Sequence, residues 1–188
     1  MRILWLDIET TGLDKSKNGI IQIAGIVDID GEAVESFNYA MNPEKEIDPG
    51  AQAIHGVTPP EILRFPSRET TFRDFVALLD RYVDEADRGT RFHPGGYNVR
   101  FDLDFLEQWF REMRSASLYG YVRHEKVDPS IMMKAFQSYL GKERLPSWSL
   151  RAVASSLGVD LGHHHDALED IRFTREIHRR LQDFFGER

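Results

Sequence analysis

The feature that most constrains the fold is an apolar segment near the start of the chain that ends in two acidic residues. Residues 3–9 read ILWLDIE. In a β-strand alternate side chains point to opposite faces, so the even-numbered residues would line one face, and all of them are apolar. The odd-numbered residues would line the other face and end with Asp7 and Glu9. Apolar side chains on both faces are typical of a central strand that is covered on both sides.

The two acids sit where a strand of this kind ends. Residues two positions apart, such as Asp7 and Glu9, lie roughly 6–7 Å apart along a strand. Two carboxylates side by side at the end of a buried strand lose hydration and repel each other unless positive charge lies between them. A divalent cation would supply that charge. The simpler alternative is a strand end that frays into solvent, where both acids stay hydrated.

The composition excludes several classes of protein. The chain has 188 residues, enough for one domain with a substantial core, and it has no cysteine for disulfides or a thiolate zinc site. We find no signal peptide and no membrane-spanning stretch, so we expect a cytoplasmic protein with no membrane partner. The net charge of −7 disfavours broad electrostatic binding of duplex nucleic acid, but it allows a small site where metals supply the positive charge.

Residue patterns predict a single α/β domain that spans residues 1–188. We expect a three-stranded antiparallel meander at its start, because Asp30-Gly31 is a hairpin signal between the second and third strands. Further strands are expected near residues 90–97 and 127–129, each leading into a helix. The prediction is therefore a central mixed five-stranded sheet, made of the meander plus parallel strands and flanked by helices.

Helical spacing of apolar residues marks the helices. We expect them over about residues 71–83, 102–113, 150–157 and 166–184, with Thr70 or Thr71 capping the first. Residues 42–60 are polar and contain four prolines, which predicts a long loop. Long ordered loops in compact domains are often functional.

A third acidic candidate lies at the start of a predicted helix. Asp102 directly follows the fourth strand, a common place for functional groups in α/β sheets. Asp104 competes with it, because residues two apart on a helix do not share a face and only one of them can point toward Asp7 and Glu9. A carboxylate at a helix start also has a purely structural use, in capping and in compensating the helix dipole.

The last predicted helix carries an acid on its apolar stripe. Asp170 falls among the core-facing positions, so it needs a partner, either a metal shared with Asp7 or a buried arginine. His165 precedes it by five residues and can reach the same site from the entry loop. A histidine with a pKa near 6.5 suits a general base for water. The neighbouring His163 and His164 are interpreted as surface residues.

Taken together, these residues resemble the DnaQ-like 3′–5′ exonucleases, the histidine-bearing (DEDDh) branch of the DEDD superfamily. Three motifs match in order: Asp7-x-Glu9-Thr10-x-Gly12, Asn98-x-x-Phe101-Asp102 and His165-x-x-x-x-Asp170. The second motif selects Asp102 over Asp104, and the third selects His165 among the three histidines. The HGVT sequence at residues 55–58 also looks like a loop of this family. The resemblance extends from residue 2 to about residue 181.

The resemblance implies a ribonuclease-H-like fold and two divalent cations, normally Mg²⁺ or Mn²⁺. It implies that the metal ligands are Asp7, Glu9, Asp102 and Asp170, and that His165 activates the water. Oxygen-only ligands suit hard cations, and two ions about 3.5–4 Å apart can generate the nucleophile and stabilise the departing 3′ oxygen. The implied reaction removes nucleoside 5′-monophosphates from the 3′ end of a single strand.

The resemblance also suggests where the terminal nucleotide binds. In relatives the backbone after the first motif approaches that nucleotide, and glycine permits a close approach. The substrate-binding candidates are Thr10, Thr11, Gly12, Leu13, His55, Asn98 and Phe101. Four of them have an ordinary alternative: Leu13 as a loop anchor, Phe101 as a core residue, and His55 and Asn98 as loop-stabilising hydrogen bonders.

Several functions stay open at this point. The leading hypothesis is a metal-dependent 3′–5′ exonuclease on single-stranded nucleic acid, with DNA favoured over RNA because the second motif is closer to the proofreading type. The alternatives are an oligoribonuclease or RNA 3′-end trimming enzyme, a ribonuclease-H-like endonuclease, and a module that binds nucleic-acid ends without cleaving them. Proofreading subunits often carry a C-terminal extension for a polymerase partner. Because the chain stops soon after the last helix, we expect a free-standing enzyme.

Overall fold

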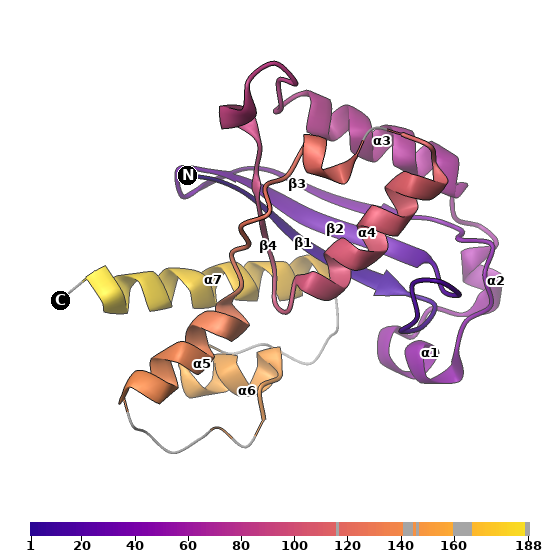
Figure 1. Ribbon diagram of the computed structural model, residues 1–188. Helices are drawn as coiled ribbons and strands as arrows, with labels where there is room; N and C mark the ends of the chain where they lie inside the picture. The colour runs from indigo at the N-terminus through magenta and orange to yellow at the C-terminus, as the bar shows by residue number, and fades with distance from the viewer. Residues whose placement is uncertain (116, 141–144, 146, 160–166, 187–188) are drawn as a thin grey trace.

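The centre of the molecule is a mixed β-sheet (Figure 1). The computed structural model describes residues 1–115, 117–140, 145, 147–159 and 167–186, and in these residues the sheet has four strands in the order β3-β2-β1-β4. Strands β1 (Arg2–Thr10), β2 (Ile20–Ile29) and β3 (Glu32–Ala40) form an antiparallel meander. Strand β4 (His93–Gly95) is parallel to β1. The predicted α/β class and the meander are therefore confirmed.

The prediction of a fifth strand is wrong, since the sheet has four strands in the part of the chain that the structure describes. Val127 forms only an isolated parallel bridge with Gly95. Pro94, in the middle of β4, has no N–H to donate, and Pro129 begins a helix, so the ladder cannot extend in either direction. The segment still lies beside the sheet, because the Val127 N–H donates to the Pro94 carbonyl at 2.9 Å.

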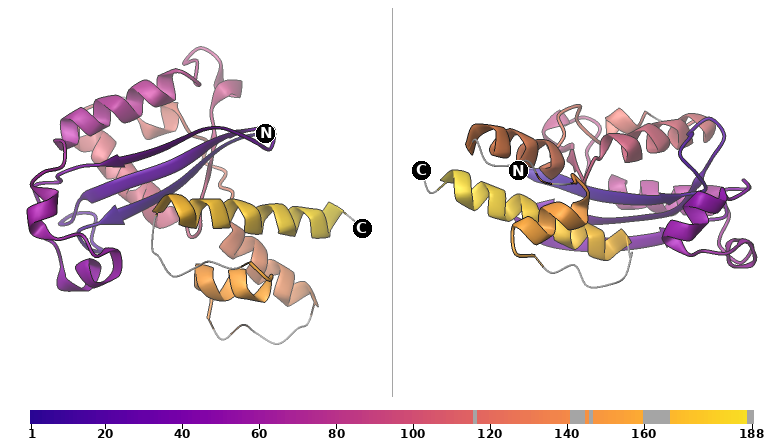
Figure 2. Two further views of the ribbon diagram at one scale, coloured as in Figure 1. Left: turned by 180° about the vertical axis from the view of Figure 1, so that it is seen from behind. Right: turned by 90° about the horizontal axis from the view of Figure 1, so that it is seen from below.

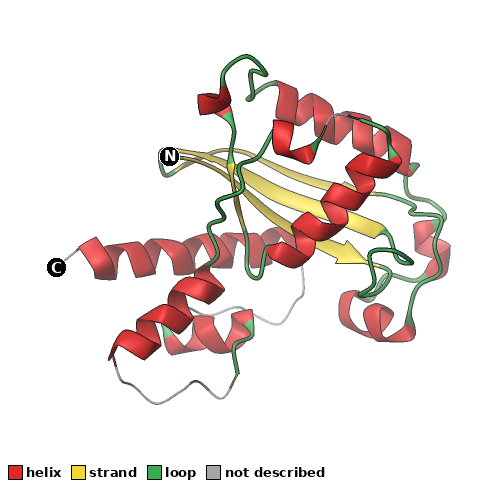
Figure 3. Ribbon diagram, viewed as in Figure 1, coloured by secondary structure: helices red, strands yellow, loops and turns green. Residues whose placement is uncertain are grey.

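Helices cover both faces of the sheet, as Figures 2 and 3 show. One face carries α3 (Arg68–Asp80) and α4 (Arg100–Glu112), and the other carries α7 (Ala167–Gly186). Helices α5 (Pro129–Leu140) and α6 (Leu150–Ser156) pack against α7. The connections include single 3₁₀ turns at Arg88–Thr90 and Leu118–Gly120. No helix in the described ranges is long and apolar enough to cross a membrane.

Strand β1 is buried on both faces, as its alternation predicts. Leu4, Leu6 and Ile8 pack into the core cluster that α3 and α4 form on one face of the sheet. Ile3 and Trp5 pack into a separate cluster with residues of α7 on the other face. By the same alternation, the two acids of β1 lie on the face that α7 covers.

Two of the local predictions need correction. The segment 42–60 is not simply a loop, because it contains α1 (Pro49–His55) and the start of α2 (Pro59–Ile62). Both helices begin with proline, whose fixed φ suits the first helical position. Helix α3 begins earlier than predicted, because Ser67 caps it by accepting the Thr70 N–H at 3.2 Å.

Candidate active site

The first two candidate ligands lie at the C-terminal end of β1. Asp7 and Glu9 are both half-buried and pair in register with Ala24 and Gln22 of β2. The register shifts between Glu9 and Thr10, where β1 ends. An irregularity of this kind at a strand end is a common device for redirecting side chains next to active sites.

Asp102 meets β1 between these two acids. It lies in the first turn of α4, is only 4% exposed, and its Oδ1 accepts the Ile8 N–H at 3.0 Å. Asp104 lies elsewhere, since its carboxylate pairs with Lys15 at 3.3 Å and with Arg100 at 3.9 Å. Of the two competing acids on this helix, the structure therefore brings Asp102 to the strand.

The fourth acid comes from α7, which covers the face of the sheet opposite to α4. Asp170 lies half-buried in the first turn of α7. Burial raises the pKa of Asp7 well above its ordinary value, and the charges of Asp102, Glu9 and Asp170 raise it further. The pKa of Glu9 rises to about 7, first because of burial and then because of Asp170. Asp7 is therefore within electrostatic range of the other three acids.

The pKa of Asp102, on α4, is also raised. Burial raises its pKa to about 8, although the hydrogen bond from Ile8 favours the charged form, and the charges of Asp128 and Glu9 add to the rise. Asp128 is itself buried at the start of α5, where its Oδ1 accepts the N–H groups of Asn98 at 3.2 Å and Ser130 at 2.9 Å. A fifth carboxylate therefore lies near the cluster, and the sequence analysis did not single it out.

The chemistry of these donors fits divalent cations. The described ranges contain no group of three or more acidic or histidine side chains already arranged around one ion position. The donors are all carboxylate oxygens, which hard cations such as Mg²⁺ and Mn²⁺ prefer, and a bound cation would remove their mutual repulsion. Metal ligation by these acids stays a prediction. His165 lies outside the described residues, so its role also stays a prediction.

A cavity of about 410 Å³ opens beside Glu9. Its walls come from the end of β1, the loop that follows, helix α1 and the start of α4. Five of the seven substrate-binding candidates line it: Thr10, Gly12, Leu13, His55 and Phe101. Its volume lies in the range of small-molecule sites. The structure thus brings these five residues together next to the acids.

Apolar surface lies exposed around this cavity. Leu13 is 84% exposed and Ile54 is 63% exposed, while Phe101 is half-buried against Phe105 with ring centroids 5.0 Å apart. Exposed apolar groups at a cavity mouth are typical of a ligand site. Ile54 and Asp48 also line the cavity, but the sequence analysis missed them because it treated their segment as loop. The signal was present, because Pro49 at the start and Gly56, with φ 74°, at the end bracket a short helix.

The other two candidates, Thr11 and Asn98, do not line the cavity. Thr11 is fully buried, and its hydroxyl accepts the Gly19 N–H at 3.1 Å, which closes the loop after β1. Asn98 is exposed and adopts a left-handed backbone with φ 58° just before α4. Both therefore have local structural roles in the described part of the chain, and their contact with substrate stays a prediction.

Two cavity residues have geometry that bears on ligand binding. The His55 Nδ1 accepts the Val57 N–H at 3.0 Å, which leaves the proton on Nε2, and Nε2 is enclosed with no partner among the described residues. Burial lowers the pKa of His55, so its ring is a neutral donor. Gly12 is packed tightly, since a Cβ there would lie 2.0 Å from the Asp48 Oδ2. Asp48 thus lies against Gly12, and the approach of a nucleotide to Gly12 stays a prediction.

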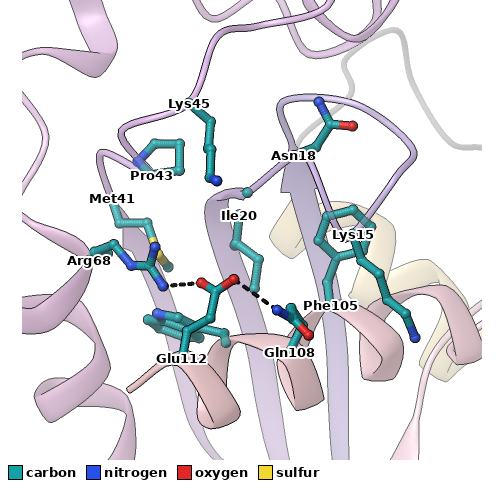
Figure 4. Close-up of a pocket in the computed structure, with 12 residues that line it drawn as sticks. Lys15, Asn18, Ile20, Met41, Pro43, Lys45, Arg68, Phe105, Gln108 and Glu112 are labelled. Atoms are coloured by element: carbon teal, nitrogen blue, oxygen red, sulfur yellow. Dashed lines mark hydrogen bonds and ion pairs between the residues drawn. The ribbon is translucent and has the colours of Figure 1, made fainter. Parts of the chain in front are cut away.

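A second hollow lies on the side of the same loop that faces α4 (Figure 4). It holds only about 20 Å³, enough for a water molecule but not for a nucleotide. Its arginine is already engaged, because Arg68 pairs with Glu112, which also accepts from the Gln108 Nε2 at 2.9 Å. The cavity beside Glu9 is the better candidate for substrate.

The fold is of the ribonuclease-H-like type, and the acids at the end of β1 are those expected of a nuclease with this fold. Comparison with known proteins agrees, since the model of an exonuclease family, RNase_T, matches residues 4–178. The chain belongs to this family, and within it to the DnaQ-like 3′–5′ exonucleases of the DEDD superfamily.

Relatives in sequence are PolC-type DNA polymerases III. The protein from Thermotoga petrophila is 29% identical over 176 residues, which cover 94% of this chain and 11% of that protein. The protein from Thermotoga maritima is 27% identical with the same coverage. The chain therefore spans only about a tenth of the length of these relatives.

Similar solved structures are of exonuclease I. One has a TM-score of 0.79 at 22% identity and covers 99% of this chain and 43% of that one. A zinc-bound complex of the E. coli enzyme with single-stranded DNA has a TM-score of 0.77 at 21% identity, covering 99% and 43%. The enzyme from Methylocaldum szegediense has a TM-score of 0.79 at 21% identity, covering 97% and 40%. At these identities the likeness supports the fold.

Proposed function

We propose that this 3′–5′ exonuclease uses two divalent cations, Mg²⁺ or Mn²⁺, to hydrolyse the terminal phosphodiester bond of single-stranded DNA and release a nucleoside 5′-monophosphate. The observation that carries the proposal is the meeting of acids from β1 and α4, where the Ile8 N–H donates to the Asp102 Oδ1 at 3.0 Å, beside a cavity of about 410 Å³. The domain that does this is proposed to be the whole chain, residues 1–188.

The ligands proposed for the metals are Asp7, Glu9, Asp102 and Asp170. The charge of Asp7 interacts with all three of the others, so its replacement is expected to do the most damage. When bound, the ions would lower the pKa of a water and stabilise charge on the departing oxygen. His165 is proposed to take the proton from that water, a role that suits a histidine titrating near neutral pH.

The terminal nucleotide is proposed to enter the cavity beside Glu9. Leu13 and Phe101 offer apolar surface for the base, and Leu13 would lose most of its 84% exposure on contact. The enclosed Nε2 of His55 would donate to an oxygen of the sugar or phosphate. These contacts hold one nucleotide and do not require a long track along the strand. That fits a chain with a net charge of −7.

DNA is proposed over RNA because of the relatives. The PolC-type proteins are DNA polymerases, and a solved neighbour is a complex of exonuclease I with single-stranded DNA. Discrimination against RNA depends on how a site treats the 2′-hydroxyl. Matched DNA and RNA oligonucleotides, digested in parallel, test this part of the proposal separately from the reaction itself.

The reaction is tested with an oligonucleotide labelled at its 5′ end. With Mg²⁺ or Mn²⁺ we expect a ladder of shortened products and mononucleotides that keep their 5′ phosphate. Asp7→Ala and Asp170→Ala should nearly abolish the ladder, and His165→Ala should reduce it severely. Asp104→Asn is the matched control, because Asp104 pairs with Lys15 away from the cluster. Intact substrate with both metals would contradict the proposal, and cleavage of circular single strands would point to an endonuclease.

A further inference from the structure

A separate cavity of about 420 Å³ lies at the other end of β1. Its walls are the start of β1, the turn between β2 and β3, and the part of α7 that follows its first turn. The most buried titratable residue that α7 contributes to this cavity is His178. It follows Asp170 by two helical turns, roughly 12 Å along the axis at about 1.5 Å per residue. This cavity is therefore distinct from the carboxylate cluster and from the cavity beside Glu9.

Two buried side chains in the wall of this cavity lack hydrogen bonds. The Trp5 Nε1, and both ring nitrogens of His178, are enclosed and have no partner among the described residues. Trp5 is 1% exposed and His178 is 7% exposed, and their rings meet edge to face with centroids 5.2 Å apart. Buried donors without partners are rare in native proteins and costly, so they call for an explanation.

His178 is a neutral ring in this setting. Burial lowers its pKa, which outweighs the opposite effect of the nearby Asp28 charge. A neutral imidazole has one N–H donor and one acceptor, whereas the Trp5 indole has a donor alone. The wall thus has two N–H donors and a single ring acceptor without partners. A ligand rich in acceptors would satisfy the wall if the His178 ring turned toward the open side of the cavity.

Among the described residues that line the cavity, one cationic side chain has no ion-pair partner. Each acid in the wall is already paired: Asp28 with the Arg175 Nε at 2.7 Å, Asp30 with the N-terminal ammonium, and Glu176 with the Arg179 Nε at 2.9 Å. Arg172 also lines the cavity, is exposed, and forms no ion pair with the described residues. The wall therefore carries an uncompensated positive charge, in a chain whose net charge is −7.

We propose that this cavity binds a small molecule that bears an acidic oxyanion, a carboxylate or a phosphate, with Arg172 as its charge partner and Trp5 and His178 as neutral donors. Guanidinium groups form charge-assisted hydrogen bonds with both kinds of oxyanion. A cationic ligand does not fit, because every acid in the wall has a partner. A volume of about 420 Å³ leaves room for a body larger than the anion itself.

The test uses inorganic phosphate and acetate as probes on the full chain, labelled with ¹⁵N and kept free of metal by a chelator. The indole N–H signals of Trp5, Trp109 and Trp148 report on three separate places, and Trp5→Phe assigns the first. We expect a saturable shift of the Trp5 signal with at least one probe, with no comparable shift for Trp109 or Trp148. The probe that binds more tightly identifies the carboxylate or the phosphate as the preferred group.

Variants make the assignment specific. Arg172→Gln, a change at an exposed position, should weaken binding of the probe by about tenfold or more, because a charge-assisted hydrogen bond is lost. His178→Phe should remove the response of the Trp5 signal while preserving the ring volume. Arg111→Gln, at an exposed position on α4, is the matched control and should change nothing. A Trp5 signal that stays fixed with tens of millimolar of both probes, or that shifts equally in Arg172→Gln, would overturn the proposal.

Discussion

Glu9→Gln should stabilise the metal-free protein at alkaline pH, although it removes a residue that we place in the active site. The pKa of Glu9 is about 7 in the folded chain and 4.5 ordinarily, because burial and Asp170 disfavour its charge. Each pKa unit of difference corresponds to about 1.36 kcal/mol, so ionised Glu9 costs the fold up to about 3 kcal/mol. Glu9 is only half-buried, so solvent screening lowers this, and we expect about 1–3 kcal/mol.

The sign follows from proton linkage. The folded state holds the Glu9 proton more tightly than the unfolded state, so this group contributes stability below pH 4.5 that is lost as pH rises through about 7. Wild-type protein in chelator should therefore lose stability between pH 5 and pH 8. Glutamine carries no charge at either pH, so the variant should lose less, and its advantage should grow as the pH rises.

The measurement is thermal unfolding in chelator at several pH values. For a domain of this size about 1 kcal/mol corresponds to about 2–4 °C, so the variant should melt about 2–12 °C above wild type at pH 8. Adding Mn²⁺ should reverse the order, because metal binding stabilises only the form with the full ligand set. Glu32→Gln, at the exposed start of β3, is the control. It should neither raise the melting temperature at pH 8 nor change the response to Mn²⁺. A variant that melts at or below wild type at pH 8 would refute the reasoning.

Three further predictions concern the site and its loop. Asp102→Asn should lower kcat by about 100-fold or more in the oligonucleotide assay, because a ligand for catalytic ions is lost, whereas Asp104→Asn should stay within about twofold, since surface ion pairs contribute little. Leu13→Ala should raise KM by about tenfold with kcat nearly unchanged, because it removes apolar contact with the base; an unchanged KM would argue against that contact. Gly12→Ala should lower the melting temperature, since its Cβ would lie 2.0 Å from the Asp48 Oδ2; unaltered melting would show that Asp48 moves at little cost.

Local patterns were sufficient to predict the core of the fold. The alternation in β1 predicted two buried faces, and the structure places Leu4 and Leu6 with α3 and α4, and Trp5 with α7. The hairpin signal at Asp30-Gly31 predicted the meander, and both residues have positive φ there. These features depend on side-chain periodicity and on turn chemistry, which a sequence states directly.

Features that depend on distant partners were harder to predict. The sequence left Asp102 and Asp104 as equal alternatives until the family resemblance chose between them, because helical spacing does not say which face meets the strand. The bond from the Ile8 N–H to Asp102 spans 94 positions in the chain and has no local signature. Similarly, the cavity beside Glu9 depends on α1, whose residues were read as loop because a helix of seven residues shows too few turns for periodicity.

Asp102 has two roles, and they explain how the fold tolerates a site that destabilises it. Its Oδ1 satisfies the Ile8 N–H in the interior, which holds α4 against β1 whether or not the carboxyl is charged. Burial nevertheless raises its pKa to about 8, so in the absence of metal the proton stays on at neutral pH and relieves the repulsion from Glu9. Asparagine preserves the acceptor and removes only the charge, whereas alanine would also leave the Ile8 N–H unpaired, at a cost of about 1–3 kcal/mol. For that reason the asparagine variant separates metal ligation from folding, and an alanine variant would not.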